Sequence, residues 1–319
     1  MRWSRLVMSV LALTLGLAGP AEAAPAEVRV LTWNIWRGGL GAGADNLPRL
    51  LDQIVAVRPD VLLAVETYGA GEQIRQALTR RAGKGAYSGT QITPSTTGGD
   101  NLWIFTRYPV TKTYPAPSGG KVTAFNFGGV QVRLPGGRPL NLFDTWLPYT
   151  DPWSGYLIDE NAAAIRAGLP PRHTPAAVAA AETAQTGYLS EIIARHLPAG
   201  PAVLGGDFNT PAASDWTEKW KDCPNHFGMA YPLRTTDLLV EAGFTDTFRA
   251  AHPSPCTAEG RTWSPQPTER MITPQRIDLT FARGAVVTGS QVLDTRLPRH
   301  GPGVFYSDHA ALLTSLRVN

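Results

Sequence analysis

The chain has 319 residues, of which 43% are hydrophobic and 17% are charged, a balance typical of globular proteins that excludes an intrinsically disordered chain. The net charge is only +3, from 29 basic and 26 acidic residues. Basic residues are scattered, with Arg80-Arg81 as the longest run, which disfavours a protein dedicated to binding duplex DNA.

The N-terminus has the pattern of a secretory signal peptide. A positively charged start, MRWSR, precedes an apolar run over Leu6–Leu17 that is short for a membrane span. The small-x-small sequence at residues 21–23 then predicts cleavage after Ala23. We therefore expect residues 1–23 to be removed and residues 24–319 to form a secreted, extracellular protein with no transmembrane segment. The alternative is an uncleaved membrane anchor.

The rest of the chain alternates between apolar runs and helical patterns. In chain order the patterns first predict a strand at Val28–Trp33, a helix within Asn46–Asp60, a strand at Val61–Val65 and a helix at Glu72–Arg81. Four strands follow, at Leu102–Thr106, Val122–Phe127, Val130–Leu134 and Leu140–Trp146, and then a polar proline-rich region at Pro148–Pro175. The last part predicts a long helix at Ala176–His196, a strand at Ala202–Leu204, a helix at Thr236–Ala242, and strands at Ile277–Phe281 and Ala310–Arg317. No repeat or linker divides this series. We expect an α+β protein with a single sandwich domain of sheets covered by helices.

Two cysteines, Cys223 and Cys256, are the only ones in the sequence. An isolated pair in an exported protein tends to be oxidised, so we predict one disulfide between them. The alternative is two buried free thiols. No Cys or His stands near either one at the spacing of a zinc site.

Four of the predicted strands end on acidic, amide or imidazole side chains. These are Asn34, Glu66, Asp207 with Asn209, and Asp308 with His309. Each alone is more often a solvated or turn residue. Together they supply what phosphoryl chemistry requires: oxygen ligands for a hard divalent cation, hydrogen-bond donors, and a base for an attacking water.

The motifs around these residues resemble the endonuclease/exonuclease/phosphatase superfamily. The matching segments are LTWNIW (31–36), VLLAVET (61–67), NLWIFTRYPV (101–110), GGDFNTP (205–211), RIDLTF (276–281) and YSDHAAL (306–312). They run over nearly the whole mature chain. The resemblance implies a four-layer α/β/β/α sandwich, with two packed mixed β-sheets flanked by helices, that carries a phosphoester hydrolase.

The resemblance also assigns a cation site. Glu66 would be the principal metal ligand, Asn34 would help to hold the metal and position the phosphate, and Asp308 would complete the metal's water shell. Mg²⁺ or Mn²⁺ is the expected cofactor.

The same resemblance assigns the catalytic set. Asp207 would orient or activate the attacking water, and Asn209 would donate a hydrogen bond to the scissile phosphate. His309 would contact the phosphate and stabilise the transition state, oriented by Asp278. Arg276, together with Arg37, is a candidate for binding a second phosphate of the substrate, although each is equally well a solvated arginine.

One position departs from the family pattern. Members usually carry a His or a Tyr after the mid-chain strand, whereas this chain has Trp146, which we expect to bind substrate. An indole donates a hydrogen bond but cannot exchange a proton at neutral pH. The leaving-group acid would then be one of Asp144, Tyr149, Asp151 or His173, the leaving group would need no acid, or the strand register is shifted by one or two residues. Further candidates for lining the substrate cleft are aromatic: Trp36, Tyr149, Trp153, Tyr156, His226 and Tyr231.

We therefore expect a monomeric, exported, metal-dependent phosphoester hydrolase acting on a small or lipid-like phosphoester. An extracellular nuclease is the first alternative, so a nucleic-acid partner stays open without being favoured. A catalytically weak phosphate-binding protein on the same scaffold is the second. A serine hydrolase is disfavoured because no G-x-S-x-G motif is present.

Overall fold

The computed structural model describes residues 25–319, so the predicted signal peptide and its cleavage site lie outside the described residues. In the described part, no helix combines the length and the apolar character needed to cross a bilayer.

Two six-stranded mixed sheets form the centre of the molecule. The first has the order β11 (Val286–Leu293), β12 (Ala311–Val318), β1 (Ala26–Asn34), β2 (Val61–Val65), β4 (Trp103–Thr106) and β3 (Ser88–Gln91). The second has the order β5 (Val110–Thr113), β6 (Phe127–Arg133), β7 (Pro139–Trp146), β8 (Ala202–Asp207), β10 (Asp278–Arg283) and β9 (Thr245–Asp246). Each sheet contains one parallel pair, β1 with β2 and β7 with β8. The remaining pairs are antiparallel.

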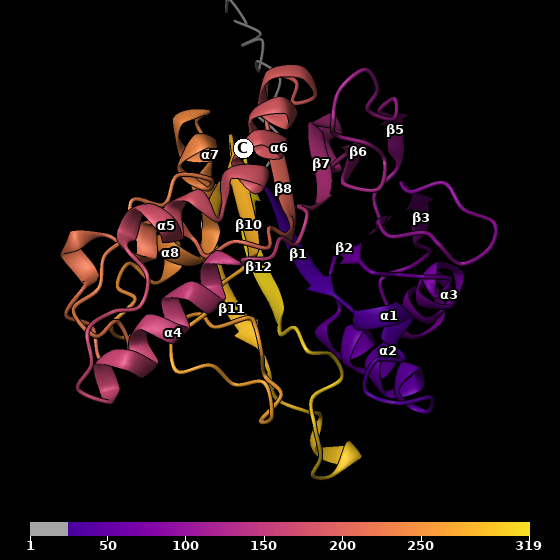
Figure 1. Cartoon of the computed structure of the whole chain (residues 1–319). Coiled ribbons are helices and arrows are strands. Elements are labelled where there is room, and N and C mark those ends of the chain that lie inside the picture. Colours follow the sequence, from indigo (N-terminus) through magenta and orange to yellow (C-terminus); the bar gives the residue numbers. More distant parts are fainter. Residues whose placement is uncertain (1–24) are drawn as a thin grey trace, which may run out of the picture.

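Helices flank the two sheets. They are α1 (Trp36–Gly39), α2 (Asn46–Val57), α3 (Gly71–Arg81), α4 (Ser154–Arg166), α5 (Pro175–Ala180), α6 (Thr183–Arg195), α7 (Asp237–Glu241) and α8 (Thr247–Ala251). Figure 1 shows α1 to α3 gathered on one side of the strands and α4, α5, α7 and α8 on the other. The predicted four-layer α/β/β/α sandwich is confirmed.

The alternation of side chains along each strand sorts the core into layers. On β1, Val28 and Val30 pack between the sheets, whereas Leu31 and Trp33 pack outward beneath α2 and α3. The outward face of the second sheet packs against α6 and α7. Strands that are buried on both faces appear in the sequence as continuous apolar runs, and these runs allowed us to predict them.

Three predicted elements differ in the structure. Val122–Asn126 is a partly buried turn and not a strand, because Asn126 and Phe127 each donate a backbone hydrogen bond to Thr123, and Phe127 begins β6. The proline-rich region contains α4, which buries Leu157 and Ile158. The long helix predicted at Ala176–His196 is two helices, α5 and α6, separated at Glu182.

A disulfide joins Cys223 and Cys256, as predicted, with Cα atoms 4.7 Å apart. It links the loop that follows β8 to the segment that follows α8. Such a bond is compatible with export.

Candidate active site

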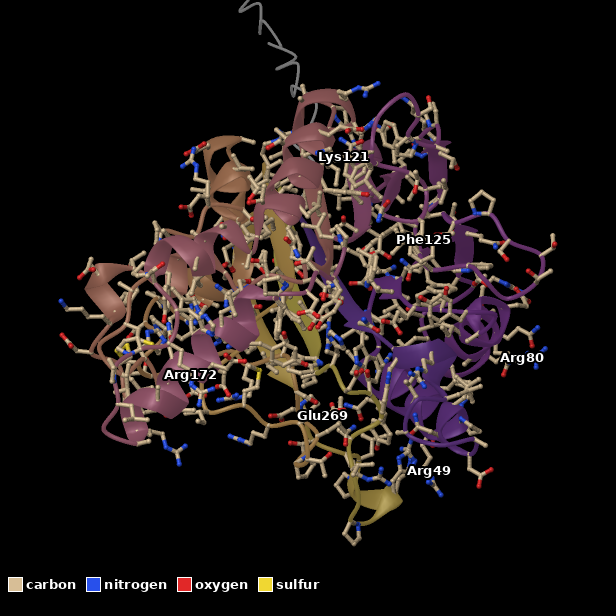
Figure 2. All side chains as sticks on the ribbon, viewed as in Figure 1. Arg49, Arg80, Lys121, Phe125, Arg172 and Glu269 are labelled. Carbon is tan, nitrogen blue, oxygen red and sulfur yellow. A yellow bond between two sulfur atoms is a disulfide. The ribbon has the colours of Figure 1, made fainter. Side chains whose placement is uncertain are left out.

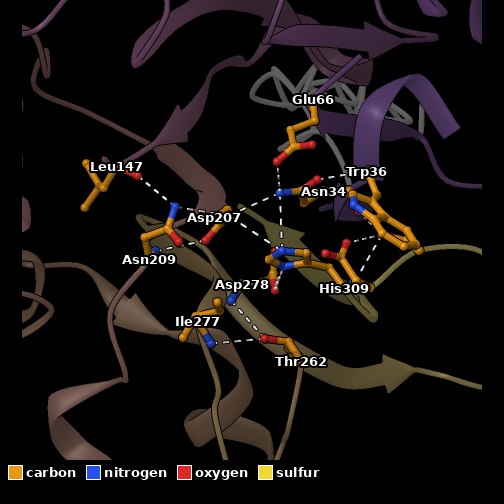
Figure 3. Close-up of polar contacts among 12 residues, drawn as sticks. Asn34, Trp36, Glu66, Leu147, Asp207, Asn209, Thr262, Ile277, Asp278 and His309 are labelled. Carbon is orange, nitrogen blue, oxygen red and sulfur yellow. Dashed lines mark hydrogen bonds and ion pairs between the residues drawn. The ribbon is translucent and has the colours of Figure 1, made fainter. Parts of the chain in front are cut away.

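The polar residues predicted at the strand ends meet at one end of the sandwich. Asn34 continues the inward-facing row of β1, and Asp207 and Asp278 continue the inward-facing rows of β8 and β10. Asp278 is the direct cross-strand partner of Asp207, which also pairs with Trp146 on β7. The two sheets therefore contribute side chains to the same point, and Figure 3 shows them converging.

The side-chain amide of Asn34 contacts three of the converging side chains. Its Nδ2 lies 3.1 Å from Glu66 Oε1, 3.2 Å from Asp207 Oδ2 and 3.4 Å from His309 Nε2. Its Oδ1 accepts the backbone N–H of Trp36 at 3.0 Å, which fixes the orientation of the amide. The Asn34 side chain thus presents N–H groups, and not its oxygen, to the carboxylates. This orientation lets Asn34 hold the carboxylates as a donor, and its expected part in holding the metal stays a prediction.

His309 and Asp278 form a buried pair. Asp278 Oδ2 lies 2.8 Å from His309 Nδ1, while His309 Nε2 faces Asp207 Oδ2 at 3.9 Å. Burial opposes a charged imidazole, but Asp278 and Asp207 outweigh it and hold the pKa of His309 well above its usual range. The imidazolium form, which can stabilise a phosphoryl oxygen, is therefore the favoured form here.

Asp207 is held by Asn209, two residues later. The Asn209 backbone N–H donates to Asp207 Oδ1 at 2.9 Å, and Asn209 itself adopts a left-handed backbone with φ of 46°. Its Nδ2 donates to the Leu147 carbonyl at 2.9 Å and contacts Asp207 Oδ2 at 3.3 Å. Both amide hydrogens thus have acceptors inside the protein, and this geometry lets Asn209 position Asp207, while its predicted hydrogen bond to the phosphate stays a prediction. Burial raises the pKa of Asp207 to about 7.

Two further carboxyl groups border the site. Glu66 follows β2 in a left-handed conformation with φ of 58°, and its Oε2 accepts the backbone N–H of Arg37 at 3.0 Å. Burial raises the pKa of Asp308 to about 6; His309 opposes this shift, and the nearby charge of Glu66 adds to it. Non-glycine residues with positive φ are uncommon and cluster at functional sites.

The charge balance of these groups fits a divalent cation. Four carboxyl groups, Glu66, Asp207, Asp278 and Asp308, surround one imidazole, and in the part of the chain that the structure describes no Lys or Arg forms an ion pair with any of them. One ligand atom each of Asp207, Asp278 and His309 lie within 4.8 Å of one another. A cation in that group would compete with the hydrogen bond between Asp278 and His309, whereas Glu66 and Asp308 offer oxygen ligands that no cationic side chain occupies.

A small cleft opens at this point. It has a volume of about 190 Å³ and is lined by Glu66, Trp146, Tyr149, Trp153, Tyr156, Asp207, Asn209, Trp263, Ile277 and His309. The structure thus brings Trp146 and three of the predicted cleft aromatics to the site. Trp146 lies beside Asp207 in the register of β7 and β8, at the end of the mid-chain strand.

Other predicted residues lie elsewhere. Arg276 is buried and forms ion pairs with Asp215 and Asp246 at 2.8 Å, so its assignment to substrate binding is not supported. Asp144 is buried on β7, where burial raises its pKa well above the usual range, and it does not line the cleft.

Several of the remaining candidates also lie outside the cleft. His173 pairs with Glu160 at 2.7 Å, and Asp151 is exposed. His226 stacks on Trp216, with ring centroids 4.3 Å apart, and the Tyr231 hydroxyl accepts a hydrogen bond from Asn161. Tyr149 is therefore the one proposed substitute acid that lines the cleft, and Trp36 and Arg37 do not line it.

Two residues that support the site were not singled out from the sequence. Buried Ser307 donates to the Asn34 carbonyl at 2.8 Å and accepts the backbone N–H of His309 at 3.0 Å, which ties the loop before β12 to the end of β1. Trp263 lines the cleft from an irregular segment. A serine just before the Asp-His pair was a visible signal, whereas a lone tryptophan in a polar segment was not.

The sequence model of the Endonuclease/Exonuclease/phosphatase family matches residues 31–309, a span that includes every strand-end residue of the site. The chain belongs to the endonuclease/exonuclease/phosphatase family. Members of this family are hydrolases that act on phosphoesters, and they generally use divalent metals. Among curated proteins, an uncharacterized protein of Caenorhabditis elegans is 27% identical over 309 residues, covering 89% of this chain and 90% of that protein.

Solved structures of family members share the fold. The structure of a family protein from Bacteroides vulgatus is 15% identical, with a TM-score of 0.59, and covers 92% of this chain and 100% of that one. The human Nocturnin catalytic domain with bound sulfate is 16% identical, with a TM-score of 0.54, and covers 91% and 94% of the two chains. At these identities the likeness concerns the fold alone.

Proposed function

We propose that this protein is an exported, divalent-metal-dependent hydrolase of small or lipid-like phosphoesters. The observation that carries the proposal is the buried pair of His309 and Asp278 beside Asp207, at the floor of a cleft bordered by Glu66. Family membership supports the reaction class, and the disulfide is compatible with export.

The chain's own residues supply most of the parts of a phosphoester hydrolysis. Asp207, held by Asn34 and Asn209, would orient and activate a water for attack on phosphorus. His309, charged and aligned by Asp278, would donate to a nonbridging oxygen as negative charge grows in the transition state. Glu66, with Asp308, would hold Mg²⁺ or Mn²⁺, which when bound would neutralise phosphate charge.

The leaving group would depart near Trp146. Its indole can donate a hydrogen bond to the leaving oxygen but cannot deliver a proton at neutral pH. Tyr149 lines the same cleft and is half exposed, so it is the proposed proton donor for poor leaving groups. Good leaving groups would need no such donor.

The scatter of positive charge supports a small substrate over duplex DNA. In Figure 2 the labelled basic side chains Arg49, Arg80, Lys121 and Arg172 lie far apart in the view. No Lys or Arg is among the residues that line the cleft. Duplex binding requires a continuous basic surface that neutralises several phosphates.

The first test concerns metal dependence and the role of Glu66 as the metal ligand. We expect EDTA to abolish turnover of bis-p-nitrophenyl phosphate by the mature protein, and Mg²⁺ or Mn²⁺ to restore it. Glu66→Gln should lower kcat/KM by roughly 10²-fold or more, because it removes the anionic ligand. Initial rates would be measured over a range of metal concentrations.

The matched control is Glu218→Gln, which changes an exposed glutamate to the same amide. Turnover that persists in EDTA, or a Glu66→Gln protein as active as wild type at saturating metal, would disprove the metal assignment. Comparing plasmid DNA, RNA and small phosphodiesters in the same assay would separate a nuclease from the proposed hydrolase.

A further inference from the structure

The aromatic part of the cleft forms a corner of three rings. Trp153, Tyr156 and Trp263 stand nearly perpendicular to one another, with interplanar angles of 89° for Trp153 with Tyr156, 84° for Trp153 with Trp263, and 77° for Tyr156 with Trp263. Their ring centroids are 4.9 to 5.9 Å apart. Tyr149 and Trp146 line the same cleft. A flat nucleobase stacks on one parallel face, whereas three perpendicular rings suit a compact, rounded group.

The size of the cleft supports a compact group. Its volume of about 190 Å³ lies below the roughly 300–1,000 Å³ typical of sites for larger organic ligands.

The aromatic rings favour a cation. Away from Glu66, Asp207 and His309, the cleft is lined by Trp and Tyr rings, Ile277 and Asn209, and no Lys or Arg is among its lining residues. Aromatic faces carry negative potential and attract an ammonium group within about 6 Å, and aromatic cages are a recurring means of binding quaternary ammonium ions. A neutral group of the same shape would gain only the apolar contact.

The corner is fixed relative to the reaction centre. The indole N–H of Trp153 donates to the Asn209 carbonyl at 2.8 Å, and the Asn209 backbone N–H donates to Asp207 Oδ1. Trp263 pairs through its backbone with His309 in an isolated β-bridge. A group held in the corner therefore lies at a set distance from the residues that would act on phosphorus.

We infer that this corner binds a quaternary ammonium group, so that the favoured substrates are phosphodiesters of choline. The inference rests on the proposed phosphoester hydrolysis. In the reaction, water adds to phosphorus and one P–O ester bond breaks, giving a phosphomonoester and an alcohol. The choline ester has two possible sources, a soluble ester such as glycerophosphocholine or a lipid headgroup such as that of sphingomyelin.

The test compares two substrates that differ only in charge. One is p-nitrophenylphosphocholine, and the other is p-nitrophenyl 3,3-dimethylbutyl phosphate, its neutral isostere with the same leaving group. We expect kcat/KM to be about tenfold or more higher for the choline ester, the effect of two cation–π contacts. In Trp263→Leu and in Tyr156→Leu this ratio should fall toward one, whereas in the control Trp220→Leu, outside the cleft, it should stay at the wild-type value.

A binding measurement separates this inference from the proposed function. Choline should quench tryptophan fluorescence of the wild-type protein saturably, and 3,3-dimethylbutanol should not, whether or not any ester turns over. A wild-type ratio near one with normal turnover of bis-p-nitrophenyl phosphate would overturn the choline assignment and leave the hydrolase intact. If choline does not quench the fluorescence saturably, the choline assignment is overturned as well. Turnover of glycerophosphocholine would identify a soluble source, and turnover of sphingomyelin vesicles a lipid source.

Discussion

The amide of Asn34 shows how much of the site depends on a single side chain. Its Nδ2 contacts Glu66, Asp207 and His309, and its Oδ1 is held by the backbone of Trp36. A residue with one donor end and one acceptor end can hold two carboxylates near an imidazole without adding charge. Aspartate at this position would add another negative group to a site that already has four.

A pH-rate profile tests the pair of His309 and Asp278. Because Asp278 raises the pKa of His309, the imidazolium persists to higher pH, and activity should fall only as pH rises through that raised pKa. Asp278→Asn removes the charge, lowers the pKa of His309, and should shift the alkaline limb of kcat/KM to lower pH. Asp222→Asn, an exposed change, is the control. An unshifted limb would assign Asp278 a purely structural role.

His309→Ala is the companion variant. We expect turnover to fall by roughly 10²-fold or more at the pH optimum, because the side chain acts on charge that develops in the transition state. KM should change less than kcat. A loss of only a few fold in steady-state assays would place His309 outside the reaction.

At the scale of elements, edge strands and central strands differ in how well the sequence predicted them. All eight central strands were anticipated at least in part. The four strands that were missed, β3, β5, β9 and β11, are the outermost strands of the two sheets. Edge strands are short or half exposed, so they lack the continuous apolar runs that mark a strand buried on both faces. The local pattern contained too little signal to identify them.

The break between α5 and α6 has an identifiable cause. Glu182 is buried, and its carboxylate accepts the backbone N–H groups of Arg234 and Thr235 and the hydroxyl of Thr210, the last at 2.9 Å. The alanine-rich run that surrounds it predicted one continuous helix, because helical propensity carries no information about a distant loop. The tertiary contacts of one residue override that propensity.

Glu182→Ala should destabilise the fold. Three donors, two of them buried, would lose their acceptor, at a cost of about 1–3 kcal/mol for each buried donor left unsatisfied and without water. Urea unfolding followed by circular dichroism would measure the loss, and Glu218→Ala, at an exposed site, provides the baseline. Equal stability of the two variants would show that the loop does not depend on Glu182.

At the scale of the whole molecule, the site could be located from the sequence because its side chains lie at the ends of central strands. Asn34, Glu66, Asp207 and His309 were named from their positions beside predicted strands, and Asp278 was named from the family resemblance. The directions of the amides of Asn34 and Asn209 could not be predicted, because they depend on the backbone of Trp36 and Leu147. Trp263 could not be placed either, because it reaches the cleft from an irregular segment.

The disulfide gives a global prediction. Cys223 and Cys256 close a loop with a sequence separation of 33 residues, for which the chain-entropy relation gives a stabilisation of about 3–4 kcal/mol. Reduction should lower Tm, and Cys223→Ser/Cys256→Ser should show the same lowered Tm without reductant. Calorimetry with and without dithiothreitol tests this. A double variant as stable as the oxidised protein would show that the bond contributes nothing.

Because one sheet supplies Asn34 and Glu66 and the other supplies Asp207 and Asp278, the reaction centre straddles the seam of the sandwich. Any slip of one sheet against the other separates donors from acceptors there, while the hydrogen bonds within each sheet remain. Turnover therefore depends more strongly on the alignment of the two sheets than any measure of secondary structure does. A molecule whose sheets had shifted against each other would lose activity before its secondary structure unfolds.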